Sequence, residues 1–449
     1  MIATLALGIL IARVLGEAAY GQYVSVWAII VTMDVVAHMG TETIIVRESA
    51  GDLGRAPELV SNAITIRFGL GLLAYGAAIV VALLMKQGPV FVGYVAIAGL
   101  GFFVSWHSLI ATYFDATLRI GTRTFLVTGC LLLTLALTMI ALFLKMGLGA
   151  VLWAAVLGNF VALIVAYLLI CRHFRPSLGR NLTVMKDMLL ASWPLAGSMF
   201  LIMIAARVNL LMVLKMKGDV VVGGYGAAVR ITESLGVIPQ AFMLSVFTLM
   251  SFYHAREPAR FAAVYRQSLK YLSAIILPLA LFISFYSEPI LRISYGESFV
   301  FAAPAMAIHA WFMFFVFIGG ANYGAIVAEN RQKIVLAVDA CLLIPAVVLY
   351  LVLIARYSIV GAALAVVLHQ IVHYVALLLI PSTRKYTLTS VTASFKPIVA
   401  VSCAAACLYW VKSPLGVLLA LPVYVFVLWL VRGIHKEDRD LLLKVIRGT

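Results

Sequence analysis

The sequence predicts an all-α integral membrane protein with about 14 transmembrane helices, and three observations support this fold class. First, 64% of the 449 residues are hydrophobic and only 11% are charged, whereas an ordinary soluble domain has about 25% charged residues. Second, the apolar residues form long runs, many of them near the length of about 20 residues that crosses a hydrocarbon core as a helix. Third, Lys and Arg concentrate in alternate loops between these runs, as expected for loops on the cytoplasmic side.

Fourteen apolar runs can be recognised, and the gaps between them are too short to hold a soluble domain. The gaps contain many of the Gly, Pro and charged residues, which is typical of connections at a membrane surface. The runs cover residues 1–15, 22–44, 61–85, 91–114, 125–144, 149–171, 188–214, 222–250, 270–287, 299–326, 333–354, 359–381, 394–411 and 415–432.

The distribution of basic residues predicts the orientation of the chain. The loops after even-numbered runs, with their flanks and the C-terminal tail, hold 22 of the 33 Lys and Arg residues, whereas the loops after odd-numbered runs hold eight. We therefore expect the even-numbered loops and the C-terminus to be cytoplasmic. The formal net charge of +15 then reflects basic loops that face anionic headgroups, and we expect no nucleic-acid partner.

The chain repeats itself across six runs. The segment Gly16–Tyr23 after the first run matches Gly218–Tyr225 after the seventh in glycine, acid, glycine and tyrosine, at a constant offset of 202. Gly149–Leu152 and Gly361–Leu364, which open the sixth and twelfth runs, match at an offset of 212. Because six is an even number, both copies of a six-helix unit insert in the same orientation, which is the parallel arrangement of internal repeats.

This repeat predicts two six-helix lobes and a C-terminal extension. We place the N-terminal lobe at residues 1–181 and the C-terminal lobe at residues 182–383. Residues 384–449 then form two additional transmembrane helices and a basic cytoplasmic tail. The five cysteines are odd in number and form no CxxC, so we expect neither a disulfide framework nor a metal site. No Gly-rich phosphate-binding loop of the nucleotide-hydrolase type occurs, and we expect no cofactor.

Several short segments resemble one known family. They are Ala12–Gly16 followed by Tyr20–Tyr23 and Arg47-Glu48, then Tyr295–Phe299 before the tenth run, and Ser358–Ala363 at the entry to the twelfth. Together they resemble the Wzx-type polysaccharide flippases of the multidrug/oligosaccharidyl-lipid/polysaccharide exporter superfamily. The sequence departs from the family pattern at Glu17, where the family often has Pro, and at Ser358 with the preceding Ile354-Ala355, where it often has a further Gly and Ile-Pro.

The resemblance implies a function as well as a fold. It implies two lobes around a central cavity that opens alternately to either side of a bacterial inner membrane. The implied cargo is a polyprenyl-pyrophosphate-linked oligosaccharide surrounded by membrane lipids, with H⁺ or Na⁺ as the coupling ion of an antiporter. A glycan polymerase or a glycosyltransferase is an implied partner.

Four arginines are the candidate contacts for the cargo. Arg207 and Arg230 lie well inside the seventh and eighth runs, where an ionisable group usually faces a cavity or a partner. Guanidinium groups bind a pyrophosphate through paired, charge-assisted hydrogen bonds. The alternative for Arg230 is an ion pair with Glu233 on the same helix face. The resemblance adds Arg13 and Arg47, for which the alternative is snorkelling to the headgroups. For Arg67 we favour snorkelling to the cytoplasmic face.

Asp34, His38 and Glu42 are the main candidates for ion coupling. They are four residues apart in the second run, so a continuous helix would place them in one stripe. A histidine between two carboxylates can pass a proton in the physiological pH range. The alternative is a polar stripe without a transport role. Glu233 and Asp339 are further candidates for the same role, whereas His369 and His373 fit packing or cavity-lining positions.

Three classes of function fit a membrane protein of this kind. The first is transport of a lipid-linked oligosaccharide, and the second is multidrug export within the same superfamily. Cationic drugs favour acidic cavities, so the intramembrane arginines favour the first class. The third class is a membrane enzyme such as a glycan polymerase or ligase, which would carry its catalytic groups on a sizeable outer loop. The outer loops here are short, so we expect no enzymatic activity.

Overall fold

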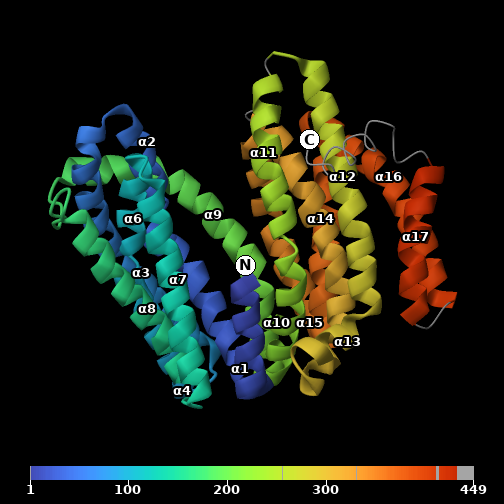
Figure 1. Ribbon diagram of the computed structural model, residues 1–449, viewed down its shortest axis with the longest axis horizontal. Helices are drawn as coiled ribbons and strands as arrows, with labels where there is room; N and C mark the ends of the chain where they lie inside the picture. The colour runs from blue at the N-terminus through green and yellow to red at the C-terminus, as the bar shows by residue number, and fades with distance from the viewer. Residues whose placement is uncertain (1, 255, 330, 411–413, 432–449) are drawn as a thin grey trace. The chain divides into compact units, whose positions relative to one another are not determined.

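The computed structural model describes residues 2–254, 256–329, 331–410 and 414–431, and every regular element in these ranges is a helix (Figure 1). In chain order the elements are α1 (Ile2–His38), α2 (Thr41–Gly51), η1 (Leu53–Arg55), α3 (Ala56–Met85), α4 (Pro89–Gly99), α5 (Gly101–Val104), α6 (His107–Ala116), α7 (Ile120–Phe143), α8 (Gly147–Ile170), α9 (Leu182–Lys217), α10 (Asp219–Ser234), α11 (Val237–His254), α12 (Pro258–Phe285), α13 (Ser287–Ser294), η2 (Glu297–Ala302), α14 (Ala303–Ala328), α15 (Gln332–Leu379), α16 (Pro381–Trp410) and α17 (Pro414–Leu430).

The helices group into two compact units. The N-terminal unit comprises residues 6–226, and the C-terminal unit comprises the described residues from 227 onward together with residues 2–5. The lobe boundaries expected from the repeat, after residues 181 and 383, stay a prediction. The basic tail expected at the C-terminus lies outside the described residues.

The predicted all-α membrane fold is confirmed. Within the described residues, 11 helices are long and apolar enough to cross a membrane. Two of these candidate spans, Ala3–Ser49 and Lys333–Leu379, are 47 residues long. Each contains a residue with non-helical backbone angles, Gly16 or Ser358, and therefore covers two of the predicted runs. The shorter apolar helix Leu419–Leu430 corresponds to the last run, so the helices account for all fourteen.

One backbone feature recurs at the connections that follow the first six odd-numbered runs. At each of these six connections the residue that begins the next span has a positive φ: Gly16 (81°), Gly88 (96°), Gly147 (81°), Gly218 (85°), Gly296 (107°) and Ser358 (52°). Two of the connections hold a second such residue, Lys86 (58°) and Lys145 (53°). Four of these glycines have ψ values of 174°, 169°, −179° and 174°, a region that is essentially restricted to glycine. A glycine in this conformation lets one span end and the next begin within a few residues.

The six positions also pair across the predicted duplication. Gly16 and Gly218 are 202 residues apart, and their backbone angles are nearly equal. Gly88 and Gly296 are likewise six runs apart and nearly equal in φ and ψ. The third pair joins Gly147 to Ser358, the position at which the sequence departs from the family pattern. The matching backbone conformations support a duplicated six-helix unit independently of the sequence motif.

Five of these six named residues are glycine and the sixth is Ser358, so we expect Ser358→Gly to stabilise the protein. Ser358 has φ 52° and ψ −133°, outside the left-handed well that other residues tolerate. Strain of this kind costs about 1–3 kcal/mol, and the backbone entropy lost by glycine offsets about 0.5–1 kcal/mol of it. Thermal unfolding in detergent should show a higher midpoint for Ser358→Gly. Ser358→Ala keeps the strain and serves as the control, and an equal gain in both variants would contradict this explanation.

The two copies of the repeat motif contact each other directly. A Cβ atom on Gly21 of α1 would lie 1.9 Å from the Asp219 carbonyl oxygen of α10, and a Cβ atom on Gly223 would lie 2.1 Å from the Glu17 carbonyl oxygen. Both pairs of equivalent residues are 202 apart, so the contact is reciprocal. Gln22 Nε2 also donates a hydrogen bond to Asp219 Oδ2 at 2.8 Å. We call these close approaches the glycine contact; only glycine permits backbones this near.

The packing of each unit explains where its polar residues lie. In the N-terminal unit, α2, α3, α6 and α9 share a core that contains Ile45, Val60, Leu109 and Met188, and this core adjoins the polar cluster described below. In the C-terminal unit, α12, α14, α16 and α17 share a larger core. The Tyr424 hydroxyl of α17 donates to the Ala274 carbonyl of α12 at 2.9 Å, so the last helix is held to its own unit.

An ion-pair cluster closes the end of α14. Glu329 is 12% exposed, and its carboxylate lies 2.6 Å from Lys385 Nζ and 3.4 Å from Arg331 Nε. Burial alone would raise the pKa of Glu329. The hydrogen bond from Lys385, together with the charges of Lys385 and Arg331, outweighs burial and holds the pKa below the usual value of 4.5.

The lowered pKa of Glu329 predicts a pH-dependent contribution to stability. A carboxyl whose pKa is lower in the folded than in the unfolded state stabilises the fold at neutral pH, and this contribution is lost as the pH falls through the folded-state pKa. We expect Glu329→Gln to cost about 0.5–1 kcal/mol near neutral pH. Thermal unfolding should show the gap between wild type and variant closing in acid. A gap that stays constant with pH would contradict the ion-pair account.

Candidate functional site

The predicted stripe of Asp34, His38 and Glu42 is divided by a break in the backbone. Met39 and Gly40 have φ values of 47° and 67°, so α1 ends at His38 and α2 begins at Thr41. The Thr41 hydroxyl donates to the His38 carbonyl at 2.9 Å and caps the end of α1. The expectation of one continuous helical stripe was therefore wrong. The four-residue spacing does not place Glu42 on the helix face of Asp34 and His38.

Asp34 and His38 remain a pair at the end of α1. His38 Nδ1 lies 3.0 Å from Asp34 Oδ1 and 2.8 Å from the Asp34 carbonyl oxygen. The Asp34 side chain is 45% exposed and that of His38 is 24% exposed. Both groups are therefore reachable from outside the protein core.

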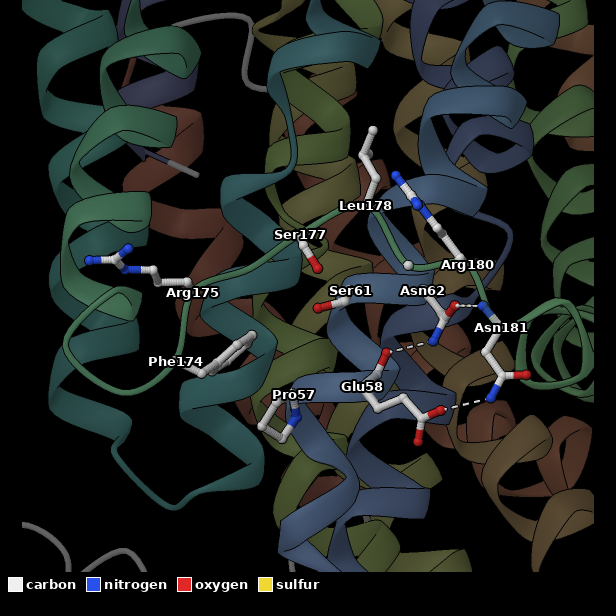
Figure 2. Close-up of a pocket in the computed structure, with 11 residues that line it drawn as sticks. Pro57, Glu58, Ser61, Asn62, Phe174, Arg175, Ser177, Leu178, Arg180 and Asn181 are labelled. Atoms are coloured by element: carbon white, nitrogen blue, oxygen red, sulfur yellow. Dashed lines mark hydrogen bonds between the residues drawn. The ribbon is translucent and has the colours of Figure 1, made fainter.

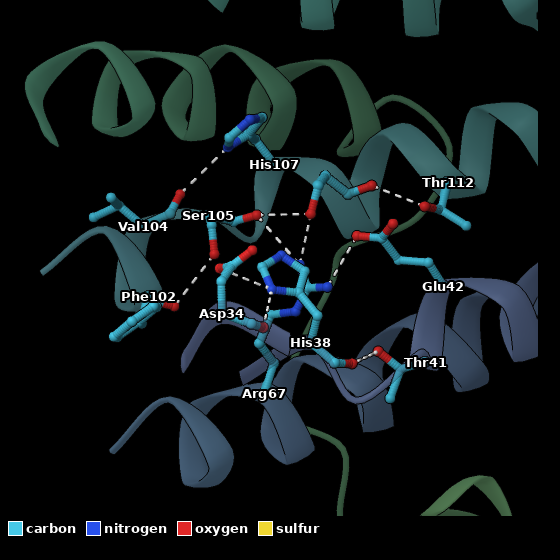
Figure 3. Close-up of polar contacts among 11 residues, drawn as sticks. Asp34, His38, Thr41, Glu42, Arg67, Phe102, Val104, Ser105, His107 and Thr112 are labelled. Atoms are coloured by element: carbon cyan, nitrogen blue, oxygen red, sulfur yellow. Dashed lines mark hydrogen bonds and ion pairs between the residues drawn. The ribbon is translucent and has the colours of Figure 1, made fainter. Parts of the chain in front are cut away.

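Glu42 pairs with Arg67 of α3. Arg67 Nη2 donates to Glu42 Oε1 at 2.9 Å, and the Arg67 side chain is 0% exposed. Arg67 Nη1 donates to Ser108 Oγ at 2.6 Å and to the Ser105 carbonyl at 3.3 Å (Figure 3). The expectation that Arg67 snorkels to the membrane surface was wrong, because the carboxylate of α2 and the polar groups at the α5–α6 break hold its guanidinium inside the unit.

The two partners of this ion pair differ in their exposure. The Glu42 side chain is 39% exposed although its guanidinium partner is fully buried. Figure 3 shows Asp34, His38, Glu42 and Arg67 gathered between α1, α2, α3 and the α5–α6 segment, with His107 nearby. The carboxylates thus form the open side of the cluster, and the arginine forms its closed side. Arg67 was missed as a candidate because its partner lies 25 residues away in sequence.

A second carboxylate–histidine pair occurs in the C-terminal unit. His373 Nε2 lies 3.0 Å from Asp339 Oδ1, with exposed fractions of 15% and 33%. Both residues belong to α15, on opposite sides of the break at Ser358. The interpretation of His373 as a packing residue missed this pairing, since the fold back at Ser358 brings the two together. The role of Asp339 in ion coupling stays a prediction.

The four candidate arginines occupy different environments. Arg13 and Arg47 are exposed, and Arg47 Nη2 forms an ion pair with Glu48 at 3.2 Å. Arg207 of α9 and Arg230 of α10 are half-buried, and so is Glu233. Arg207 lies in the N-terminal unit and Arg230 in the C-terminal unit. Contact of these arginines with a cargo stays a prediction.

A shallow pocket of about 770 Å³ lies beside the start of α3 (Figure 2). The segment before α9 forms one wall, where Asn181 Nδ2 donates to Glu58 Oε1 at 2.9 Å and the Asn181 amide donates to Asn62 Oδ1 at 3.1 Å. Arg175 and Arg180 extend from opposite ends of the pocket in Figure 2. Because these two cations do not converge, the pocket does not form an anion site.

Within the residues that the structure describes, no group of three or more His, Cys, Asp or Glu side chains is placed to hold a metal ion. The described cluster around Glu42 contains carboxylates, imidazoles and a guanidinium. Such a set can exchange protons and bind anions.

Comparison with known proteins gives one family and a set of similar structures. A family model described as "Polysaccharide biosynthesis protein" matches residues 10–304, more than half of the chain. No curated protein matches the sequence significantly.

Three solved structures illustrate the structural likeness. The lipid II flippase MurJ in an inward closed conformation is 15% identical, covers 98% of this chain and 97% of its own, and has a TM-score of 0.74. A multidrug resistance MATE family transporter of the MOP superfamily, in an inward-facing conformation, is 16% identical with coverages of 88% and 96% and a TM-score of 0.65. An outward-facing structure of such a transporter has 16% identity, coverages of 87% and 92% and a TM-score of 0.59. The chain is similar to all three in fold.

Proposed function

Because the chain belongs to the polysaccharide biosynthesis protein family, we propose that it is a flippase that moves a polyprenyl-pyrophosphate-linked oligosaccharide across the bacterial inner membrane. The family match confirms the resemblance seen in the sequence, and the chain has the transporter fold of the MOP superfamily. In this proposal the two six-helix lobes open alternately to the two sides of the membrane, and the C-terminus is cytoplasmic.

The observation that carries the cargo assignment is the presence of half-buried arginines in membrane-spanning helices. Arg207 and Arg230 are both half-buried in helices of transmembrane length. An arginine there carries a permanent charge, and a guanidinium can bind a pyrophosphate through paired, charge-assisted hydrogen bonds. Similarity in fold to a lipid II flippase supports the same class of cargo.

A binding measurement tests the role of these arginines. We expect a short-chain polyprenyl pyrophosphate to bind the purified protein, and Arg230→Ala to weaken binding by about 10–100-fold, the loss of a hydrogen bond to a charged group. Arg356→Ala removes an exposed arginine and serves as the control. Equal affinity of wild type and Arg230→Ala would contradict the proposed anion site.

Ion coupling is the second part of the proposal. Asp34, His38 and Glu42 are accessible titratable groups at the break between α1 and α2, and Asp339 with His373 forms a comparable pair in α15. A gradient of H⁺ or Na⁺ discharged at these groups would drive the cycle. A glycan polymerase or glycosyltransferase would supply or consume the lipid-linked sugar.

The alternative is a multidrug exporter. The likeness to MATE family transporters, with a TM-score of 0.65, and the accessible carboxylates of Asp34 and Glu42 support it. Gradient-driven efflux of a cationic dye from proteoliposomes, together with no movement of a lipid-linked sugar, would favour this alternative.

A further inference from the structure

We infer that Arg67 is a positioning residue for ion coupling, and that the ion exchanged at its partner Glu42 is a proton rather than Na⁺. The inference rests on the proposed function, because it names the ion and a further residue for a coupling site whose role in transport is itself proposed. It starts from the ion pair between α2 and α3, in which one partner is accessible and the other is fully buried.

Arg67 is fixed by contacts on several elements. Its two terminal nitrogens donate to Glu42 of α2, to Ser108 of α6 and to the carbonyl of Ser105. Its Nε is buried and has no hydrogen-bond partner among the described residues. A guanidinium held in this way cannot follow a moving carboxylate into solvent. Glu42, which is 39% exposed, is therefore the partner that is free to change its state.

The charge of Arg67 selects the ion. A Na⁺ bound at the Glu42 carboxylate would lie within a few ångströms of the guanidinium, and repulsion between two cations at that distance is large wherever water is scarce. A proton is different, because it forms a covalent O–H bond and leaves a neutral acid beside the arginine. Among the described residues, no cluster of carboxylates supplies the several oxygen ligands that a metal ion needs.

The proposed coupling step is the binding and release of one proton at Glu42. A proton from water binds the carboxylate of Glu42, and the ion pair with Arg67 becomes a weaker contact between a cation and a neutral acid. Arg67 keeps its bonds to Ser108 and Ser105. The constraint that joins α2 to α3 and α6 is thereby loosened, and release of the proton restores it. Proton binding at Glu42 is in this way coupled to movement of α2.

Other titratable groups face the same cluster and must be separated from Glu42. They are Asp34 and His38 of α1 and His107 of α6, whose charges act on Arg67 or Glu42. On α9, which also packs against α2, Lys186 and Asp187 are exposed. Variants Asp34→Asn, His38→Gln and His107→Gln therefore accompany the test. A pH response that is lost in one of these three variants but kept in Glu42→Gln would place the exchanging group there and overturn the inference.

The experiment uses proteoliposomes that contain the full-length protein and a polyprenyl-pyrophosphate oligosaccharide. Sugar exposed on the far leaflet is counted with a pH gradient at equal Na⁺, and with a Na⁺ gradient at equal pH. For one proton per cargo, a gradient of one pH unit should shift the leaflet distribution by up to about tenfold. We expect this response in wild type and in Glu58→Gln, an exposed carboxylate of the same unit.

The variants give a matched set. Glu42→Gln, and the double variant Glu42→Gln/Arg67→Met in case the single variant does not fold, should lose the pH response. Arg67→Lys keeps the positive charge and should restore part of it relative to Arg67→Met. A response to the Na⁺ gradient alone, or a pH response that survives in the double variant, would overturn the inference.

The failure of the inference is distinguishable from the failure of the proposed function. If the protein moves sugar but the leaflet distribution does not respond to either gradient, the proposed function is upheld and the inference is overturned. If wild type moves no sugar, the proposed function fails, and the inference is judged without cargo by infrared spectroscopy. A protonated carboxyl band that appears on acidification and is missing in Glu42→Gln would uphold proton exchange at Glu42. The absence of a Glu42-dependent band would overturn it.

Discussion

Gly223→Ala is expected to destabilise the protein strongly, although the same change at most helical glycines is neutral or favourable. A methyl group on Gly223 would lie 2.1 Å from the Glu17 carbonyl oxygen, and one on Gly21 would lie 1.9 Å from the Asp219 carbonyl oxygen. These atoms belong to backbones, so no rotamer change can relieve the overlap. Overpacking costs about 1–3 kcal/mol and more where the backbone must move, so we expect at least the upper end of this range.

The measurement is thermal unfolding of the purified variants in detergent. Gly21→Ala should match Gly223→Ala, because the two contacts are reciprocal. Gly76→Ala is the control, since Gly76 lies in α3 with nothing within 4 Å of the added carbon and should gain up to about 1 kcal/mol from helix propensity. Equal midpoints for Gly223→Ala and Gly76→Ala would contradict the close approach of α1 and α10.

Glu42→Gln should destabilise the fold by about 3–5 kcal/mol, the cost of leaving a buried charge without its partner. The reason is the burial of Arg67, whose side chain is 0% exposed and would be left as an uncompensated charge. Arg67→Met should cost less, because the Glu42 carboxylate that remains is 39% exposed and can be hydrated.

A double-mutant cycle measures the coupling between Glu42 and Arg67. Replacing both partners of a buried pair by neutral groups is often close to neutral in stability. The double variant Glu42→Gln/Arg67→Met should therefore be more stable than Glu42→Gln alone, with unfolding free energies read from thermal or denaturant transitions. Additive losses, with the double variant the least stable of the three, would show that the two side chains do not stabilise each other.

The sequence predicted the fold because membrane-spanning helices follow from local patterns. Apolar length defined the spans, and the repeat motif at Gly16 and Gly218 indicated equivalent positions that have nearly equal backbone angles. The φ and ψ values at these two positions require glycine, so the sequence motif reflects a local backbone conformation. The short connections between spans could also be predicted, because they too follow from local sequence patterns.

The cluster around Glu42 was only partly predictable. The residues Asp34, His38 and Glu42 were recognised by type, but the break at Met39 and Gly40 depends on a positive φ at a non-glycine residue, which helix periodicity does not encode. The partnership of Arg67 with Glu42, and that of Asp339 with His373, depends on how separate helices pack. Pairings of this kind cannot be read from one sequence, because many helix rotations satisfy the same apolar pattern.

The most direct test of the proposed cargo is flipping in proteoliposomes that contain only the purified protein, bilayer lipids and a polyprenyl-pyrophosphate oligosaccharide. Oligosaccharide that reaches the far leaflet is counted by a probe that cannot cross the membrane, and protein-free vesicles give the background rate. A flippase predicts transfer well above background, with a lower rate in Arg230→Ala. Transfer at the background rate, in vesicles that expel a cationic dye when a gradient is imposed, would contradict a lipid-linked sugar as the cargo.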